Sequence, residues 1–434
     1  MLIFSTILIL IITLVIGVSI PFAFGSALIF YIITKGISPA FLIPNGYSKI
    51  ANLVLLCIPL FILGGTVMKR GKVGDALVGF VEQFVGRFKG GLGAVTIIAC
   101  ALFGAVCGSS SATLSSIGSI MQPKLAEKGY PRGIGASIIA NSSVLGLLIP
   151  PSAAQVIYAW SGGQSVAACF LATVIPGIIL VILFSIVQYF MVRNIADIKV
   201  LPKLPREKFY NDFKQKTVHA FPALLMPVII LGGIYGGIMT PMESAAVGVI
   251  YCIPIGFYFY KGLTIKNLGE SIMEAANTTG AVMLMLMSAM LFSRILIMER
   301  TPDQLLNILI NISPNKYFII LMVNLIMVFC GMLMDDGSAI MLCTPLLLPI
   351  ASGIGIHPIQ FAAILGVNLG MGLVTPPVAP MLYFGSQIGK SPISEMIMPT
   401  MKFILFAWIP TLILTTIFPQ ISLTLPRLIL GLKF

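Results

Sequence analysis

Apolar runs of about twenty residues follow one another along almost the whole chain, and this feature restricts the fold most strongly. Runs of this length can cross the hydrocarbon core of a bilayer as helices. Charged residues make up 9% of the chain, against about 25% in soluble domains, so they cannot cover a water-exposed surface. The sequence therefore predicts an all-α polytopic membrane protein. The first run, Leu2 to Ile33, lacks the basic leader of a signal peptide and is expected to stay in the membrane.

The distribution of Lys and Arg predicts how the chain is oriented. The net charge is +12, but cytoplasmic loops of membrane proteins collect basic residues, so no nucleic-acid partner is expected. The longest polar segment, 193–217, is assigned to the cytoplasm as a linker between two halves, residues 1–192 and 218–434. Counting crossings back from this linker places the basic, amphipathic stretch 69–90 on the same side.

One apolar segment of the first half is too short to span and ends in serines. Leu92 to Cys107 has about 16 residues, fewer than the ~20 that a spanning helix needs. Gly108 and three serines follow, and a second short helix leads back to charged residues. Residues 91–128 are therefore predicted to form a re-entrant hairpin with its serine tip near mid-membrane. Such irregular backbone needs protein or a water-filled cavity around it.

The next apolar segment, 131–160, contains two consecutive prolines, Pro150 and Pro151. A proline in a helix interior removes a donor and obstructs the preceding turn, at a cost of ~3 kcal/mol. In lipid, the freed carbonyl groups need other partners. A cation can bind carbonyls at the end of the first half-helix, and an anion can bind N–H groups at the start of the second. The segment is therefore predicted to be a broken helix that holds a ligand.

The second half of the chain repeats these elements in the same order. The spacing that relates Pro150-Pro151 to Pro376-Pro377 also relates Ser109-Ser110-Ser111 to Asp335-Asp336-Gly337. A second hairpin is thus predicted over 316–352 and a second broken helix over 357–388. Counting crossings makes the second hairpin enter from the opposite side. Inverted repeats of this kind are typical of secondary transporters, which bind substrate and ions at the repeat interface.

Four motifs resemble one family of membrane transporters. They are Gly-Ser-Ser-Ser-Ala-Thr at 108–113, the Asn-to-Ile-Pro-Pro-Ser run at 141–152, Gly-Met-Leu-Met-Asp at 331–335 and Thr-Pro-Pro at 375–377. They resemble the large membrane subunit of tripartite ATP-independent periplasmic (TRAP) transporters. The resemblance implies an elevator-type importer of the bacterial inner membrane, which uses a sodium gradient to take up organic acids such as sialic acid, C4-dicarboxylates or sugar acids. It also implies two partners, a small four-helix membrane subunit and a periplasmic substrate-binding protein.

The resemblance also implies site residues. One sodium site would combine the side chains or backbone of Ser109, Ser110, Ser111, Asn141 and Gly146. Another would combine those of Asp335, Gly337, Ser338, Asn368, Gly370, Gly372 and Thr375. The substrate would lie between the tips, beside Ser110, Ser111, Ser142, Pro150, Pro151, Ser152, Asp336, Pro376 and Pro377. Two residues depart from the family pattern: Asp336 adds an acid, and Ala379 stands where the family commonly has Gly.

Other interpretations stay open. Small and hydroxyl residues of membrane helices commonly serve packing, and a proline pair alone can be a kink. A stand-alone carboxylate symporter that needs no binding protein would share this architecture. An enzyme is not expected, because the chain has only two histidines, no ligand-spaced cysteines and no phosphate-binding loop. The seven cysteines are predicted to be packed free thiols, and Glu243, Glu274 and Arg294 are interpreted as residues that pair between helices.

Overall fold

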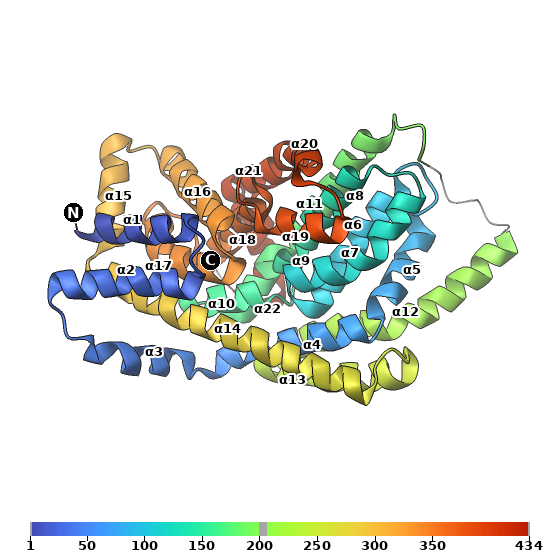
Figure 1. The fold of residues 1–434 in the computed structure, drawn as a ribbon, viewed down its shortest axis with the longest axis horizontal. Helices are drawn as coiled ribbons and strands as arrows, with labels where there is room; N and C mark the ends of the chain where they lie inside the picture. Colours follow the sequence, from blue (N-terminus) through green and yellow to red (C-terminus); the bar gives the residue numbers. More distant parts are fainter. Residues whose placement is uncertain (1, 199–205, 433–434) are drawn as a thin grey trace.

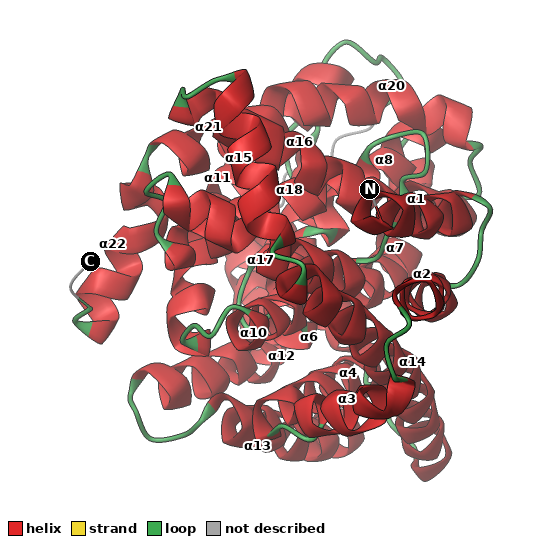
Figure 2. Cartoon of the chain, turned by 90° about the vertical axis from the view of Figure 1, so that its left-hand side faces the viewer, coloured by secondary structure: helices red, strands yellow, loops and turns green. Residues whose placement is uncertain are grey.

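A computed structural model of the chain describes residues 2–198 and 206–432, which form helices joined by loops (Figure 2). No strand occurs within these ranges. Eight of the described helices are long and apolar enough to cross a membrane, or up to nine if the bent pair Arg132–Leu148 and Ala153–Ser161 counts as one span. The prediction of an all-α polytopic membrane protein is confirmed.

The first half contains both short and long helices. In chain order they are α1 (Leu2–Val15), α2 (Ile20–Lys35), α3 (Leu42–Ile50), α4 (Cys57–Arg70), α5 (Val73–Val85), α6 (Gly91–Cys107), α7 (Ser110–Glu127), α8 (Arg132–Ser143), α9 (Leu145–Leu148), α10 (Ala153–Ser161) and α11 (Val166–Val192). Helices α6 and α7 form the first hairpin, and α8 to α10 form the first broken helix.

The second half shows a corresponding order. Its helices are α12 (Arg206–Tyr235), α13 (Pro241–Pro254), α14 (Ile265–Met298), α15 (Thr301–Ile312), α16 (Lys316–Leu333), α17 (Asp336–Gly353), α18 (Pro358–Val374), α19 (Pro380–Gly389), α20 (Ile393–Phe403), α21 (Ile409–Ile417) and α22 (Pro419–Leu430). A π-helical segment, Ile404–Trp408, joins α20 to α21. Helices α16 and α17 form the second hairpin, and α18 and α19 form the second broken helix. How the two halves lie relative to the membrane stays a prediction.

Two segments differ from the sequence-based expectation. The first apolar run is divided into α1 and α2, which pack against each other, because Gly17 turns the chain with φ 93°. Each of these helices is shorter than a full span. The predicted linker 193–217 is partly helical, since α12 begins at Arg206. The part of the linker at 199–205 lies outside the described residues.

The hairpins lie on opposite sides of the broken helices. Figure 1 shows α6 and α7 at one end of the ribbon and α16 and α17 at the other, with α10, α18 and α19 between them. Helix α14 runs along the lower side of this group beside α4, against which it packs. Helix α4 also packs on α6 and α7, so the layer of α4 and α14 borders the first hairpin directly.

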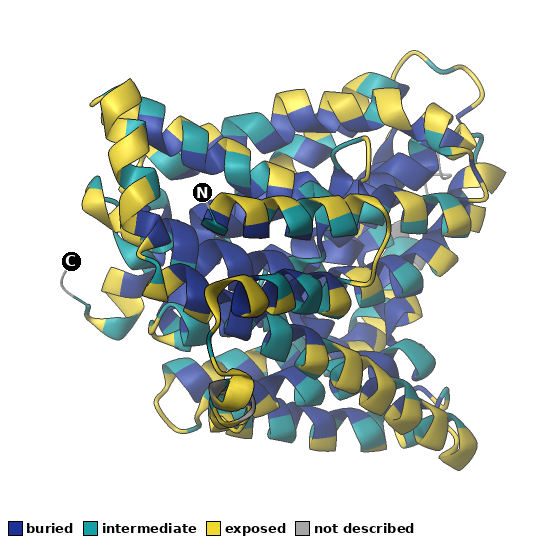
Figure 3. Ribbon diagram, turned by 60° about the vertical axis from the view of Figure 1, so that its left-hand side comes forward, coloured by how far each residue is buried: buried dark blue, intermediate teal, exposed yellow. Residues whose placement is uncertain are grey.

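The broken helices form the centre of the protein. Every residue of α18 from Ile359 to Val374 is buried, and a helix that is apolar on all sides is expected in such a position. All seven cysteines are buried and free, as predicted. Large exposed apolar side chains, such as Ile33, Ile250 and Ile265, lie on outer helices, where lipid can cover them. Figure 3 shows this division, with buried residues inside and exposed ones on the outer faces.

Candidate functional site

The tip of the first hairpin presents serine hydroxyls. Gly108 turns the chain with φ 62°, a left-handed conformation that favours glycine. Ser109 then caps α7, because its hydroxyl accepts a hydrogen bond from the Ala112 N–H at 3.5 Å, and it lies 3.1 Å from the Ser111 hydroxyl. Ser110 is buried, and its hydroxyl has no hydrogen-bond partner among the described residues. Ser111 is exposed, so the tip offers one enclosed and one accessible hydroxyl.

The first broken helix is interrupted where the proline pair predicts. The axes of α8–α9 and α10 differ by 44°. Pro150, Pro151 and Ser152 are buried, and the Ser152 hydroxyl donates to a carbonyl of α9 at 2.7 Å. The Ala153 N–H donates to the Gly108 carbonyl at 3.2 Å. The start of α10 is therefore bonded directly to the serine tip.

Close glycine contacts join each hairpin to its broken helix. A Cβ atom on Gly104 would lie 2.6 Å from the Cα of Gly146, so α6 and α9 meet backbone to backbone. In the second half, a Cβ atom on Gly372 would lie 2.8 Å from the Cα of Gly331, where α18 meets α16. Because real Cβ atoms do not approach this closely, both contacts require glycine.

Asn141 is buried and bonds to the C-terminal helices. Its amide nitrogen donates to the Ser137 carbonyl at 2.9 Å and lies 3.4 Å from the Thr400 hydroxyl. Its oxygen accepts a hydrogen bond from the indole of Trp408 at 3.2 Å. The neighbouring Ser142 is also buried and donates to a carbonyl within α8 at 2.6 Å. These contacts fix α8 against α20, while the ligand roles assigned to both residues stay predictions.

The tip of the second hairpin carries carboxylates in place of hydroxyls. Asp335 caps α17: its oxygens accept hydrogen bonds from the Gly337 N–H at 3.1 Å and the Ser338 hydroxyl at 2.6 Å. Asp336 accepts a second bond from the Gly337 N–H at 3.0 Å. Both acids are partly buried, and within the described residues neither forms an ion pair. Because uncompensated charge at membrane depth is costly, this tip suits a cation.

The second broken helix offers an enclosed oxygen near its break. Asn368 is fully buried and donates to the Asn324 side chain at 3.0 Å. Its own amide oxygen has no hydrogen-bond partner among the described residues. The Thr375 hydroxyl donates to the Met371 carbonyl at 2.6 Å; of the two prolines that follow, Pro376 is half-buried and Pro377 is exposed.

Two residues explain the conformation at this break. Ala379 precedes α19 with φ 44° and ψ 68°, in the left-handed region that glycine adopts without penalty. Gly370 packs against the Trp408 ring, which would lie 2.7 Å from a Cβ atom at that position.

Helix α10 connects the two tips. Ala153, its first residue, bonds to Gly108 of the serine tip. Ile157, four residues later, lies 3.6 Å from the position of a Cβ atom on Gly337 of the carboxylate tip. Four helical residues rise about 6 Å, so the two tips contact positions on α10 that lie about 6 Å apart along its axis. Helix α19 packs on α7 in the corresponding way.

A pocket of about 160 Å³ adjoins the serine tip. Ser109 and Ser111 line it from the tip, Lys69 from α4, Glu274 from α14 and Phe384 from α19. We call it the serine-tip pocket. A solute in this pocket would contact Ser109 and Ser111.

The two acids predicted to pair between helices behave differently. Glu274 of α14 does pair with α4, through Arg70 at 2.9 Å and Lys69 at 3.8 Å. For Glu243 the prediction is wrong, because its carboxylate caps its own helix α13 by accepting from the Thr240 N–H at 2.7 Å. A glutamate three residues after a threonine is the signal of a capping box.

Comparison with known proteins decides the family. The profile of the family described as "Tripartite ATP-independent periplasmic transporter, DctM component" matches residues 5–421. This chain belongs to the DctM family. Permeases of the DctM family work in the bacterial inner membrane together with a small membrane subunit and a periplasmic binding protein. They are transporters and not enzymes.

Curated members of the DctM family resemble the chain along most of its length. It is 34% identical over 373 residues to the C4-dicarboxylate TRAP transporter large permease protein DctM of Pseudomonas aeruginosa, covering 86% of each chain. It is 33% identical over 405 residues to the sialic acid TRAP transporter large permease protein SiaM of Vibrio cholerae, covering 93% of each chain. The YdaH transporter of Alcanivorax borkumensis shares the fold, with a TM-score of 0.63 over 88% of each chain and 11% identity.

Several residues of this site have no role in the sequence-based prediction. The Thr113 hydroxyl donates to the Ser109 carbonyl at 2.8 Å, and its place in the Gly-Ser-Ser-Ser-Ala-Thr motif could have indicated a role. Trp408 and Asn324 support the two asparagines of the broken helices, but nothing local in the sequence marks them. The sequence indicates for Lys69 only a place in the basic stretch 69–90, whereas the structure shows that it also lines the serine-tip pocket.

Proposed function

We propose that this chain is the large transport subunit of a TRAP system and imports an organic acid with sodium. The substrate class is sialic acid, a C4-dicarboxylate or a sugar acid. Relatives of the chain are named for C4-dicarboxylates, sialic acid and isethionate. The observation that supports this most is the meeting of two oxygen-rich hairpin tips at one helix, α10, between two broken helices. Small hard cations prefer such oxygen ligands.

The residues at the tips suit sodium. At the serine tip we assign the ion to Ser109, Ser110, Ser111 and Gly146, and the unpartnered hydroxyl of buried Ser110 supports this. At the carboxylate tip we assign it to Asp335, Gly337, Ser338, Asn368, Gly370, Gly372 and Thr375, and the unpartnered oxygen of Asn368 supports this. Asn141 then holds α8 in place for the first site through Trp408.

Charge compensation gives the coupling a physical reason. An organic anion that crosses the bilayer in a protein with few fixed charges needs positive charge beside it. Sodium ions at the two tips supply that positive charge, and the carboxylate of Asp336 lowers the net charge at the second tip. We propose that the hairpins and broken helices move together across the membrane, with the substrate between the tips beside Ser142, Ser152 and the two proline pairs.

Reconstitution tests this proposal. The chain and its small subunit are placed in proteoliposomes, and uptake of N-acetylneuraminate, succinate and isethionate is measured. We expect uptake of one of them to need both an inward sodium gradient and the loaded binding protein. Replacing sodium by potassium should reduce uptake to the level of empty vesicles.

The same assay examines the alternative of a stand-alone symporter. Equal uptake of free substrate without the binding protein would favour the stand-alone symporter. Uptake that ignores sodium would overturn the coupling. A match to the DctM component over residues 5–421 gives reason to expect the three-part system.

A further inference from the structure

A single cation faces the serine-tip pocket. Among the described residues that line this pocket, Lys69 carries the only positive charge and Glu274 the only negative charge. Lys69 extends from α4, outside the hairpins and broken helices, while Ser109 and Ser111 belong to the hairpin. An anion in the pocket would therefore lie between hydroxyls on one side and an ammonium group on the other.

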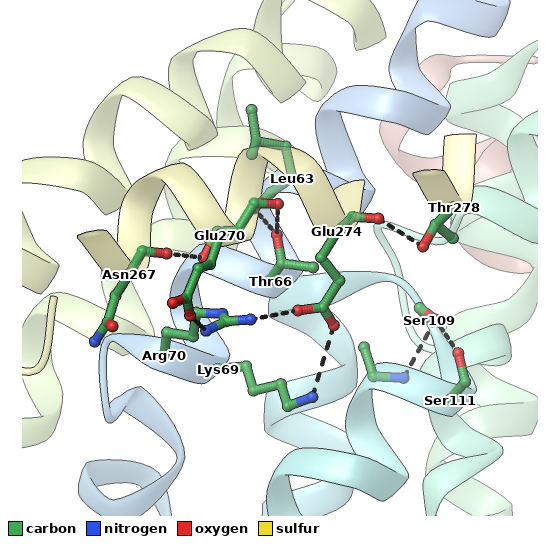
Figure 4. A network of polar contacts seen from close by, with 12 residues as sticks. Leu63, Thr66, Lys69, Arg70, Ser109, Ser111, Asn267, Glu270, Glu274 and Thr278 are labelled. Atoms are coloured by element: carbon green, nitrogen blue, oxygen red, sulfur yellow. Dashed lines mark hydrogen bonds and ion pairs between the residues drawn. The ribbon is translucent and has the colours of Figure 1, made fainter. Parts of the chain in front are cut away.

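The partners of Glu274 leave the Lys69 ammonium group available. Arg70 donates to Glu274 at 2.9 Å and also to Glu270, which gives Glu274 a strong charged hydrogen bond (Figure 4). Lys69 lies 3.8 Å from Glu274, beyond hydrogen-bond distance. Its side chain is 35% exposed. The Lys69 ammonium group can thus donate all three of its hydrogens to the carboxylate of a bound anion without breaking a hydrogen bond to a described residue.

We propose that Lys69 binds a carboxylate or sulfonate oxygen of the transported anion, and that Glu274 competes with the anion for Lys69. This rests on the proposed function and names a specificity-determining residue for it. Arg70 holds Glu274 so that its carboxylate stays beside Lys69 when no anion is bound. When the anion enters, it takes the position next to the ammonium group, and Glu274 remains paired with Arg70.

The positions of these residues allow the contact between Lys69 and the anion in only one of the two conformations of the transporter. Lys69 and Glu274 lie on α4 and α14, and the serines lie on the hairpin that we propose to move. Lys69 can therefore reach the anion only when the serine tip lies beside α4, as it does in this structure. Because Lys69 belongs to the basic stretch 69–90, the Lys and Arg distribution makes this the cytoplasm-facing conformation.

The test compares two neutral substitutions that should act in opposite directions. The dissociation constants of N-acetylneuraminate, succinate and isethionate are measured by calorimetry on the purified two-subunit complex in sodium. We expect K69Q to weaken binding of the transported anion about tenfold, and K69R to restore most of it. We expect E274Q to strengthen binding several-fold, because the competing charge is gone.

A matched control is available on the same face. Lys124 forms a similar weak pair with Glu82 at 4.0 Å and is 41% exposed, so K124Q removes the same charge away from the pocket. The K124Q complex should bind the transported anion with the same dissociation constant as the wild type. Unchanged binding in both K69Q and E274Q would show that the inference is wrong. A shift of binding in the same direction in both variants, with a loss of thermal stability, would show that Lys69 only stabilises the fold and would also overturn the inference. A wild-type complex that binds none of the three anions would overturn the proposed function together with this inference. If the wild-type complex transports an anion and K69Q binds that anion with an unchanged dissociation constant, only the inference is overturned.

Discussion

Replacement of Gly104 by Ala is expected to lower the initial rate of anion uptake at least about tenfold. The added methyl group would lie 2.6 Å from the Cα and 3.0 Å from the nitrogen of Gly146, and these backbone atoms cannot move aside as a flexible side chain could. The first hairpin must then move away from α9, which shifts Ser109 relative to the break. Misplacement of binding groups by about 1 Å can cost up to a hundredfold in rate. Uptake into proteoliposomes measures the effect.

Gly280 provides the matched control. It lies within helix α14. A Cβ atom built on it would have no described atom within 4 Å, apart from those of its chain neighbours and the backbone of its own helix. Gly280→Ala should keep the wild-type rate and add a small gain in thermal stability, since Ala favours helix. Gly372→Ala in the second half should resemble Gly104→Ala. Wild-type uptake by Gly104→Ala in a folded complex would refute the role given to the glycine contact.

Replacement of Asp335 by Asn is expected to raise the sodium concentration for half-maximal uptake at least about tenfold. Asn is as good a helix cap as Asp, so its amide oxygen can still accept the hydrogen bond from the Gly337 N–H, and its NH2 group, in place of the second oxygen, can donate to the Ser338 hydroxyl. The negative charge, in contrast, is lost, and a bound cation loses its only charged partner apart from Asp336 at this tip. A sodium titration of uptake at fixed substrate measures the change.

Asp336→Asn separates the two acids of the tip. Among the described residues, the side chain of Asp336 accepts a hydrogen bond from the Gly337 N–H alone, and it lies one residue further along the chain than Asp335. We expect a smaller sodium effect from Asp336→Asn and normal membrane insertion for both variants. If Asp335→Asn kept the wild-type titration while Asp336→Asn shifted it, the ion would belong to Asp336, and the assignment made for Asp335 would be wrong.

Local sequence signals predicted the elements that build this site. The serines at 109–111, the short segment before them and the two proline pairs give hairpins and breaks directly, because each rule acts on neighbouring residues. The same rules were less informative at Gly17, where the apolar run continues through the turn between α1 and α2. Hydropathy alone does not distinguish one long helix from two that fold back on each other.

Contacts between distant segments could not be predicted from the sequence. Trp408 and Asn141 are 267 positions apart, and they meet because α20, which leads directly into the segment Ile404–Trp408, packs against α8. The pairing of Arg70 with Glu274 depends in the same way on α4 lying beside α14. A buried Asn near a helix break predicts a residue that binds a ligand. The structure shows that the Asn141 side chain also forms hydrogen bonds with Ser137 of its own helix and with Thr400 and Trp408 of neighbouring segments.

Simultaneous fluxes of labelled sodium and labelled anion into the same proteoliposomes test the central claim most directly. The vesicles contain the chain with its small subunit, and the loaded binding protein is added outside. We expect sodium entry to rise when the anion is added, and the anion to accumulate above its external concentration while the sodium gradient lasts. Asp335→Asn should reduce both fluxes together. Accumulation of the anion without sodium entry, or sodium entry that ignores the anion, would contradict the account.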